Sequence, residues 1–334
     1  MSLNLRSVGI LGTGMCLPEK VLTNMDLEKM VDTSDEWIRT RTGIVERRIA
    51  DPHTPTSVLA EKAARMALEN ARIKAQNIGL IIVATVTPDM VFPATACLVQ
   101  DRLGATSAAA FDLEAGCSGF IYALASGAQF VASGIYDYVL VIGAETLSRI
   151  VNWEDRNTCV LFGDGAGAVV LGPVPEGYGI LGMDLGSDGG GADLLDVPAG
   201  GSLNPASEYT VKNKLHFLRM NGNEVFKFAV RIIGDSALRA LSSAGLEKEN
   251  IDFLIPHQAN IRIIQSALKR LKISEEKVYV NLDRYGNTSA ASVPIALHEA
   301  YREGLIKKDN IVVLVAFGAG LTWGAAVIRW SADI

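Results

Sequence analysis

Among the four cysteines of this chain, Cys117 has the sequence context of a nucleophile. It lies in Ala-Gly-Cys-Ser-Gly-Phe, between the apolar run 108–113, which predicts a buried strand, and residues 120–131, whose apolar spacing predicts a helix. At a helix N-terminus the peptide dipoles and free N–H groups favour the thiolate, so we expect a lowered thiol pKa and a reactive side chain. The alternative is a cysteine packed in the core, which is the commoner place for a lone cysteine.

A thiol nucleophile needs partner groups from elsewhere in the chain, and two candidates have similar surroundings. His257 follows the apolar run 251–256 and opens the segment that leads to an amphipathic helix over 261–271. Asn287 lies in Tyr-Gly-Asn-Thr-Ser-Ala-Ala-Ser, a glycine turn that leads into a further helix. Each of these two residues alone has an ordinary alternative role, that of a helix cap. Three reactive side chains at three such turns favour a shared site.

Composition sets the class of protein that must position these residues. With 334 residues, 49% of them hydrophobic and 20% charged, the chain has the composition of a globular protein with one large or two ordinary domains, and fibrous and disordered classes are excluded. The net charge of −6 gives no general case for nucleic-acid binding. No signal-like start and no apolar run near the roughly 18 residues of a membrane span are found, so we expect no membrane association and a cytoplasmic protein.

The cysteines and histidines are scattered along the sequence. No Cys-x-x-Cys pair occurs, which argues against a disulfide framework and against a zinc site, and fits a reducing compartment. The cysteines stand at positions 16, 97, 117 and 159, and the histidines at positions 53, 216, 257 and 298.

The two halves of the chain resemble each other at a constant offset of 173 residues. The matching segments are 77–82 with 250–255, 117–124 with 290–297, and 137–142 with 310–315. We therefore predict α/β halves that arose by duplication, residues 1–173 carrying Cys117 and residues 174–334 carrying His257 and Asn287. The alternative is the general likeness of βα units. Duplication would make the helix N-termini at Cys117 and Ala290 face each other, with the glycine-rich segment 182–201 as a surface loop between the halves.

Two glycine-rich motifs resemble nucleotide-binding fingerprints and fail in detail. Gly9-Ile-Leu-Gly-Thr-Gly14 has Leu17 where a third glycine is needed, and Pro18 does not open a helix there. Gly163-Asp-Gly-Ala-Gly167 lacks the Gly-Lys-Ser/Thr of a phosphate loop, and we interpret it as a place where backbones pack closely. The sequence therefore offers no nucleotide cradle.

Taken together, the motifs resemble the thiolase-fold condensing enzymes, specifically the β-ketoacyl-[acyl-carrier-protein] synthase III family, over essentially the whole chain. Elongating ketosynthases use Cys, His and His, and degradative thiolases have a second catalytic cysteine, so the set Cys, His and Asn separates this chain from both. Besides the Cys117 turn, the motifs are Trp37-Ile-Arg-Thr-Arg-Thr-Gly-Ile44, Phe162-Gly-Asp-Gly-Ala-Gly167, Met220-Asn-Gly-Asn-Glu-Val-Phe-Lys227, His257-Gln-Ala-Asn-Ile-Arg262, Gly286-Asn-Thr-Ser-Ala-Ala-Ser292 and Phe317-Gly-Ala-Gly-Leu-Thr-Trp-Gly324.

The resemblance implies a thiolase-like fold of duplicated α/β halves in five layers, αβαβα, and a decarboxylative Claisen condensation that starts fatty acid synthesis. Cys117 takes the acyl group of a short straight or branched acyl-CoA, and malonyl-acyl-carrier protein follows. His257 and Asn287 stabilise the enolate formed as carbon dioxide leaves, and the backbone N–H groups of Cys117 and Ala319 form the oxyanion hole. The family often has three glycines where this chain has Gly318-Ala319-Gly320, and a backbone donor survives that change if φ is negative.

Further residue roles are also implied by the resemblance. CoA is a substrate, and no metal or other cofactor is expected. Its binding residues would be Trp37, Arg41, Arg156, Gly222 and Asn260. The carrier protein would contact the helix that is expected to start at His257. The contacting residues would be Gln258, Ala259, Asn260, Ile261, Arg262, Lys269 and Arg270. Phe92 and Phe317 would wall the acyl pocket, with Phe92 crossing the interface of a homodimer.

Other readings remain open at this point. A condensing enzyme of secondary metabolism with another acyl donor or acceptor would share Cys117, His257 and Asn287. A Cys-His-Asn hydrolase gives no reason for the duplicated halves, and a catalytically silent binding subunit gives none for three intact reactive residues. Release of carbon dioxide from malonyl-carrier protein would distinguish a condensing enzyme from the last two.

Overall fold

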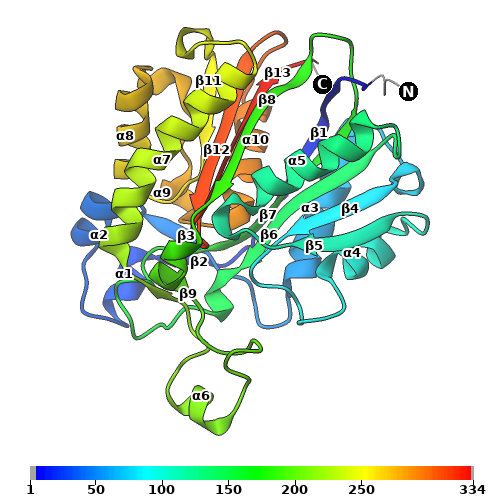
Figure 1. The fold of residues 1–334 in the computed structure, drawn as a ribbon. Coiled ribbons are helices and arrows are strands. Elements are labelled where there is room, and N and C mark those ends of the chain that lie inside the picture. The colour runs from blue at the N-terminus through cyan, green and yellow to red at the C-terminus, as the bar shows by residue number, and fades with distance from the viewer. Residues whose placement is uncertain (1–4, 332–334) are drawn as a thin grey trace.

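The computed structural model describes residues 5–331, which form two main β-sheets with helices outside and between them (Figure 1). The first sheet has the strand order β1 (Val8–Cys16), β7 (Asp164–Pro173), β6 (Val139–Thr146), β4 (Leu80–Ala84), β5 (Ala109–Leu113). The second has the order β8 (Gly179–Ser187), β13 (Thr322–Arg329), β12 (Ile311–Gly318), β11 (Phe253–Pro256). Two small sheets pair β2 (Val21–Thr23) with β3 (Glu46–Arg48), and β9 (Leu195–Asp196) with β10 (Arg219–Met220).

The two main sheets repeat the same pairing. In the first, β4 runs parallel to β6, and β6, β7 and β1 pair antiparallel in turn; in the second, β11, β12, β13 and β8 do the same. Leu80 lies opposite Val139, and Phe253 lies opposite Val312, so the register repeats at the offset of 173 that relates the sequences.

Helices cover and separate the two sheets, which gives the five layers αβαβα (Figure 1). The central layer holds α5 (Gly119–Ala132) and α10 (Ser292–Arg302). One outer layer holds α3 (Thr56–Ala71) and α4 (Thr95–Leu103), and the other holds α7 (Gly222–Ser243) and α8 (Ile261–Leu271). The shorter helices are α1 (Asn24–Glu28), α2 (Asp35–Thr42), α6 (Glu208–Lys212) and α9 (Leu282–Tyr285).

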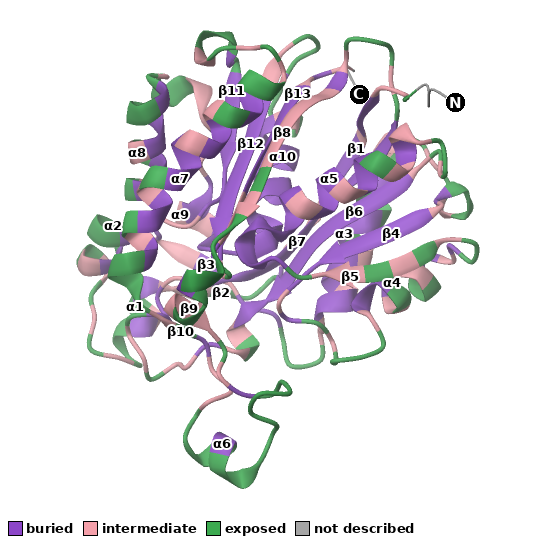
Figure 2. Ribbon diagram, viewed as in Figure 1, coloured by how far each residue is buried: buried purple, intermediate pink, exposed green. Residues whose placement is uncertain are grey.

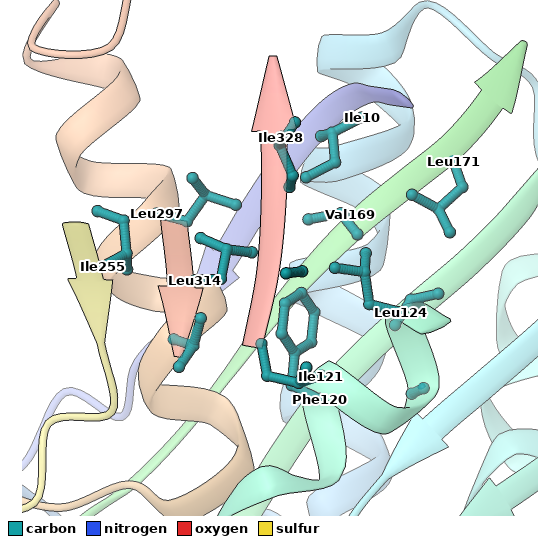
Figure 3. Packing of buried hydrophobic residues seen from close by; sticks show 14 of the residues in the cluster. Ile10, Phe120, Ile121, Leu124, Val169, Leu171, Ile255, Leu297, Leu314 and Ile328 are labelled. Atoms are coloured by element: carbon teal, nitrogen blue, oxygen red, sulfur yellow. The ribbon is translucent and has the colours of Figure 1, made fainter. Parts of the chain in front are cut away.

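The central helices are apolar because they are covered on both sides. α5 carries no charged residue, and its buried positions face both sheets. Figure 3 shows Phe120, Ile121 and Leu124 of α5 packed between side chains of both halves of the chain. Figure 2 shows the strands of the sheets mostly buried, whereas the segment around α6 is exposed and extends from the body. This shared core fixes the ends of α5 and α10, where Cys117 and Asn287 lie.

Three expectations about the elements are wrong. The strand before Cys117 is not buried: β5 is the edge strand of its sheet and is partly exposed along its length. The segment 182–201 is not a single surface loop, because residues 182–187 belong to β8, which pairs along β13, and a 3-10 helix, Gly189–Leu194, leads from there into β9. The helix after His257 begins only at Ile261, with the Asn260 side chain accepting a hydrogen bond from the Arg262 N–H as its N-cap.

The expectations for the two glycine-rich motifs agree with the structure. The glycines of 163–167 lie where backbones meet, because a Cβ built on Gly163 would be 2.3 Å from the Tyr285 carbonyl oxygen. Gly9 to Gly14 lie inside β1 and not in a loop before a helix. Within residues 5–331, no helix has the length and apolar character needed to cross a bilayer, and no group of three or more His, Cys, Asp or Glu could hold a metal ion.

Candidate active site

Cys117 lies at the turn between β5 and α5, in a short 3-10 helix, Gly116–Ser118, that continues into α5. The residue is buried, yet it lines two cavities. The small cavity has a volume of about 90 Å³ and also contains His257 and Asn287. The structure therefore brings together the three reactive residues singled out from the sequence, although they come from three separate turns.

The large cavity, of about 680 Å³, also contains Cys117 and shares Phe162 and Leu195 with the small one. Its walls are mostly apolar and include Val86, Val91, Leu147, Ile150 and Leu218. Cys117 thus lines both a narrow cavity that holds His257 and Asn287 and a wide, mostly apolar space, an arrangement that suits a thiol carrying an apolar acyl group.

His257 follows β11 and is held as a neutral hydrogen-bond donor. Burial lowers the pKa of its imidazole to about 3, so the ring is uncharged at neutral pH. Its Nδ1 lies 2.6 Å from the Ser292 Oγ, which accepts a hydrogen bond from the Gln258 N–H at 3.4 Å. The Ser292 hydroxyl can donate its proton to Nδ1 while it accepts from Gln258, and that arrangement leaves the His257 proton on Nε2.

Asn287 is fixed by its own backbone and side chain. Its N–H donates to the Leu161 carbonyl, and its carbonyl accepts from the Gly163 N–H, so the chain crosses to the 163–167 motif at this point. Its Oδ1 accepts a hydrogen bond from the Ser289 N–H at 2.8 Å. With the amide oxygen held in this way, the amide nitrogen is the group left to donate into the small cavity.

The two backbone segments expected to form an oxyanion hole are tightly interlocked. A Cβ built on Gly318 would lie 2.4 Å from the Cys117 nitrogen, and one built on Gly116 would lie 2.8 Å from the Ala319 nitrogen. The φ of Ala319 is not positive, which is the condition that the replacement of glycine at this position requires. Glycine at 116 and 318 thus lets the Cys117 and Ala319 N–H groups approach each other.

The expectation of a lowered thiol pKa is wrong for the free protein. Burial raises the pKa of the Cys117 thiol to about 12, although the nearby Ser289 hydroxyl acts in the opposite direction. The sequence indicated the helix N-terminus and not the depth of the cysteine below the surface. Loss of the thiol proton therefore needs a nearby acceptor.

Trp37 carries two guanidinium groups on its ring. Those of Arg41 and Arg156 lie 5.1 Å and 5.0 Å from the ring centroid, beside an open surface hollow of about 320 Å³. A base stacked between two planes needs about 7 Å, twice the usual contact distance. The structure thus places together the residues expected for adenine binding, in a closed arrangement in which the Arg156 side chain must move to admit a base.

The segment expected to contact a carrier protein is partly buried. Gln258 is only 1% exposed, and its side chain bonds to the Pro256 and Tyr279 carbonyls and to the Asn281 N–H. We therefore correct its role: Gln258 braces the turn after β11 and cannot reach a partner at the surface.

The other members of that segment differ in their positions. Asn260 Nδ2 donates to the Arg41 carbonyl at 3.0 Å, and both Ala259 and Asn260 line the small cavity, as does Gly222. Ile261 packs against Gly43. The exposed basic face comprises Arg262, Lys269 and Arg270, of which Arg270 is already paired with Asp235 at 3.0 Å.

The two phenylalanines expected to wall an acyl pocket lie apart. Phe317 is buried and lines the small cavity. Its ring and the His257 ring are in an edge-to-face arrangement, with their centroids 5.4 Å apart. Phe92 is 82% exposed and lines neither cavity that contains Cys117, whereas its neighbour Val91 lines the large one.

Comparison with known proteins identifies the family. Residues 111–189 match the family description 3-oxoacyl-[acyl-carrier-protein] synthase III, and residues 241–330 match its C-terminal region. A protein of Caldanaerobacter subterraneus named beta-ketoacyl-[acyl-carrier-protein] synthase III is 65% identical over 325 residues, which is 97% of this chain and 98% of the relative. The chain belongs to the β-ketoacyl-[acyl-carrier-protein] synthase III family.

Further members agree with this assignment. A synthase III of Desulfitobacterium hafniense is 63% identical over 97% of this chain and 98% of its own length. The crystal structure of 3-oxoacyl-[acyl-carrier-protein] synthase III from Aquifex aeolicus superimposes with a TM-score of 0.89 at 50% sequence identity. The match covers 97% of this chain and 100% of that one. The resemblance, the thiolase-like α/β fold and the class of acyltransferase are therefore confirmed, and the condensing enzyme of secondary metabolism is not favoured.

Three polar residues of this synthase III site were missed in the sequence. Ser289 and Ser292 stand in the quoted Gly286–Ser292 motif, where only Asn287 was given a role. Glu145 ends β6 and is fully buried. The sequence signal for Glu145 was a single glutamate directly after the apolar run Val-Leu-Val-Ile-Gly-Ala. A charged residue in such a buried strand seldom serves packing alone.

Proposed function

We propose that this chain condenses an acyl-CoA primer, acetyl-CoA or a short branched acyl-CoA, with malonyl-acyl-carrier protein. The products are β-ketoacyl-acyl-carrier protein, CoA and carbon dioxide, and the reaction initiates fatty acid biosynthesis. The observation that carries the proposal is the single small cavity in which Cys117, His257 and Asn287 meet. A nucleophile with two neutral hydrogen-bond donors suits acyl transfer followed by formation of an enolate.

In the first half-reaction, Cys117 Sγ attacks the thioester carbonyl of the acyl-CoA. The carbonyl oxygen becomes negatively charged and accepts hydrogen bonds from the Cys117 and Ala319 N–H groups. CoA leaves as the thiolate, and the acyl group remains on Cys117 with its chain in the large apolar cavity. We infer that Phe317 walls the acyl site from the small cavity, where it lies beside His257.

In the second half-reaction, malonyl-carrier protein enters and loses carbon dioxide. Its thioester oxygen accepts hydrogen bonds from His257 Nε2–H and from the Asn287 amide, which stabilise the enolate. A neutral histidine suits this step, because Ser292 holds the proton on Nε2 and the imidazole need not lose it. The carbanion then attacks the acyl carbonyl on Cys117 and releases the product.

We propose that CoA lies along Trp37, Arg41, Arg156, Gly222 and Asn260. The support is continuity: Gly222 and Asn260 line the small cavity, and Asn260 bonds to the Arg41 carbonyl beside the Trp37 ring. The adenine would stack on Trp37 once Arg156 has moved.

Replacing Arg156 by alanine should therefore raise the KM for acyl-CoA about tenfold while kcat stays close to that of the parent. The reason is that a guanidinium stacked on an adenine contributes about 1–2 kcal/mol to binding and does not touch the reacting atoms. Steady-state kinetics with acetyl-CoA as the varied substrate test this. A KM lowered by the substitution would mean that the closed Arg156 obstructs the site more than it binds the base.

We propose that the acidic carrier protein docks on the basic face of α8, at Arg262 and Lys269, with contacts to Ala259, Asn260 and Ile261 at the mouth of the small cavity. Arg270 contributes less, since Asp235 already neutralises it. This assignment places the charged face beside the entrance through which the malonyl group must pass.

Changing Lys269 to glutamate should raise the KM for malonyl-carrier protein about tenfold at low salt, with acylation by acyl-CoA unaffected. A reversed rim charge slows association and weakens the salt dependence of the rate. The measurement is the condensation rate against carrier-protein concentration at two ionic strengths. The exposed Lys62, on α3 in the opposite outer layer, gives a matched charge-reversal control; equal effects of the two variants would contradict a local docking site.

We infer that the protein is a homodimer and that it resides in the cytoplasm. We also infer that the chain divides into duplicated halves, residues 1–173 and 174–334. The exposed edge strand β5 and the exposed Phe92 support the dimer, in which Phe92 would reach the acyl pocket of the partner. The repeated strand order supports the division. The four cysteines, all unpaired, fit a reducing compartment. No metal or other cofactor takes part in the reaction proposed.

The experiment that tests the function is intact mass spectrometry of the protein after exposure to a panel of acyl-CoAs, with Cys117→Ala as the control. A chase with malonyl-acyl-carrier protein should remove the acyl mass as a β-ketoacyl product, and the best donor identifies the primer. Acylation without discharge would show that the acceptor is a different molecule. No acylation of Cys117 would overturn its role as the nucleophile.

A further inference from the structure

A carboxylate that the reaction above does not use is buried beside Cys117. Glu145, at the end of β6, is fully inaccessible to solvent. Its oxygens accept hydrogen bonds from the Thr87 hydroxyl at 2.5 Å and from the Thr85 hydroxyl and Val86 N–H at 3.2 Å. Among residues 5–331, no lysine, arginine or histidine forms an ion pair with it. A buried carboxyl without a cation is costly for the fold, which points to a role in function.

Ser289 joins this carboxyl to the nucleophile. Its Oγ donates to Glu145 Oε1 at 3.0 Å, and it lines the large cavity together with Cys117. With its single hydroxyl proton donated to Glu145, the Ser289 oxygen keeps lone pairs that can accept the proton of Cys117. Ser289 has a positive φ of 48°, an uncommon conformation for a residue other than glycine, and its N–H fixes Asn287. Ser289 thus links the cavity beside Cys117 to the Glu145 carboxyl.

The other ionisable groups near this chain are engaged elsewhere. Asp112 caps α4 through the Thr95 and Ala96 N–H groups, and Glu114 accepts from the Gly116 N–H. Asp164 pairs in register with Thr146, so its side chain points to the face of the sheet opposite to that of Glu145. His257 is neutral and bonded to Ser292. Glu145 is therefore the acceptor that Ser289 connects to the cavity of Cys117.

We propose that Ser289 and Glu145 form a proton relay that stores the proton of Cys117 while the thiol carries the acyl group. The inference rests on the proposed function and adds the fate of this proton. As Cys117 Sγ bonds to the acyl carbon, its proton passes to Ser289 Oγ, and the hydroxyl proton of Ser289 passes to Glu145 Oε1. When the product leaves and the Cys117 thiolate is released, the two transfers run backwards and restore thiol and carboxylate.

The protons balance over the whole reaction. CoA leaves as a thiolate and is protonated by solvent, which supplies the one proton that decarboxylative condensation consumes. The energetics also suit a relay: burial raises the pKa of the thiol to about 12 and that of the Glu145 carboxyl to about 7. At neutral pH the free thiolate alone would amount to about one part in 10⁵, whereas the carboxyl is poised both to accept and to release a proton.

The relay predicts how fast iodoacetamide alkylates Cys117 as a function of pH. In the parent protein the rate should rise with an inflection near pH 7, as Glu145 becomes ionised and able to accept the proton. In Glu145→Gln and Ser289→Ala this inflection should vanish, and alkylation at pH 8 should slow by on the order of 10²-fold. The direction of the change in alkylation rate is decisive, because the negative charge of Glu145 by itself disfavours the Cys117 thiolate. If only that repulsion operated, Glu145→Gln would react faster than the parent.

Peptide-resolved mass spectrometry provides the rates, with the exposed Cys97 as an internal reference in every sample. Ser289→Ala covers the case in which Glu145→Gln does not fold, since it removes the link and leaves the carboxyl its other hydrogen bonds; melting curves check both variants. An unchanged pH profile, or faster alkylation, in a folded variant would overturn the relay. The alkylation needs neither acyl-CoA nor carrier protein, so this result is independent of whether the proposed condensation is correct.

Discussion

Replacing His257 by alanine should stop condensation while Cys117 still becomes acylated. The proposed mechanism uses His257 only after CoA has left, as one of two donors to the enolate oxygen. Loss of such a donor costs about 10²- to 10³-fold in rate. The expected result is an acyl-enzyme mass equal to that of the parent, with carbon dioxide release from malonyl-carrier protein reduced by about that factor. Radiolabelled malonyl groups give the release rate directly.

Ser292→Ala is the companion to this variant. Without the Ser292 hydroxyl the Nδ1 of His257 loses the partner that keeps the proton on Nε2, although the imidazole remains in place. We expect an intermediate loss of decarboxylation, smaller than that of His257→Ala, and normal acylation. If acylation falls in parallel with decarboxylation in His257→Ala, then His257 acts on the first half-reaction and the assignment of roles is wrong.

The main features of the site could be predicted from the sequence because they depend on local patterns. Cys117, His257 and Asn287 each follow an apolar segment or a glycine turn, and the ends of buried elements tend to meet in a layered α/β fold. Ser289 and Glu145 could not be paired in the same way. They are 144 residues apart, and their contact depends on how η7, the 3-10 helix Ser289–Ala291, lies against the end of β6.

Burial was also beyond local patterns. The run 108–113 is as apolar as a central strand, yet β5 is the edge strand, and strand order is decided by contacts far along the chain. The glycines of 182–201 suggested a loop, whereas Gly182 and Gly186 lie within β8. Gly182 packs against α7, and Gly186 packs against the Trp323 ring. At Gly182 and Gly186 glycine therefore serves close packing and not flexibility.

Replacing Gly318 by alanine should reduce acylation of Cys117 by about 10²-fold or more. The new Cβ would lie 2.4 Å from the Cys117 nitrogen, so the backbone that carries both the thiol and an oxyanion donor must move. A displacement of about 1 Å at a reacting group can cost 10²-fold in rate, and overpacking destabilises by about 1–3 kcal/mol. Single-turnover acylation followed by mass spectrometry, together with thermal unfolding, measures the two effects.

Gly189→Ala is the matched control, because a Cβ at Gly189 meets no atom within 4 Å and the backbone there does not need a positive φ. Its acylation rate and melting temperature should equal those of the parent. If the Gly318→Ala protein acylates at the parent rate, the end of β12 shifts to accommodate the new Cβ without moving Cys117. The close contact between the two backbones would then not be what positions the oxyanion hole. A large loss in acylation with a small change in stability would instead locate the cost at the reacting atoms, as the close approach of Gly318 to Cys117 requires.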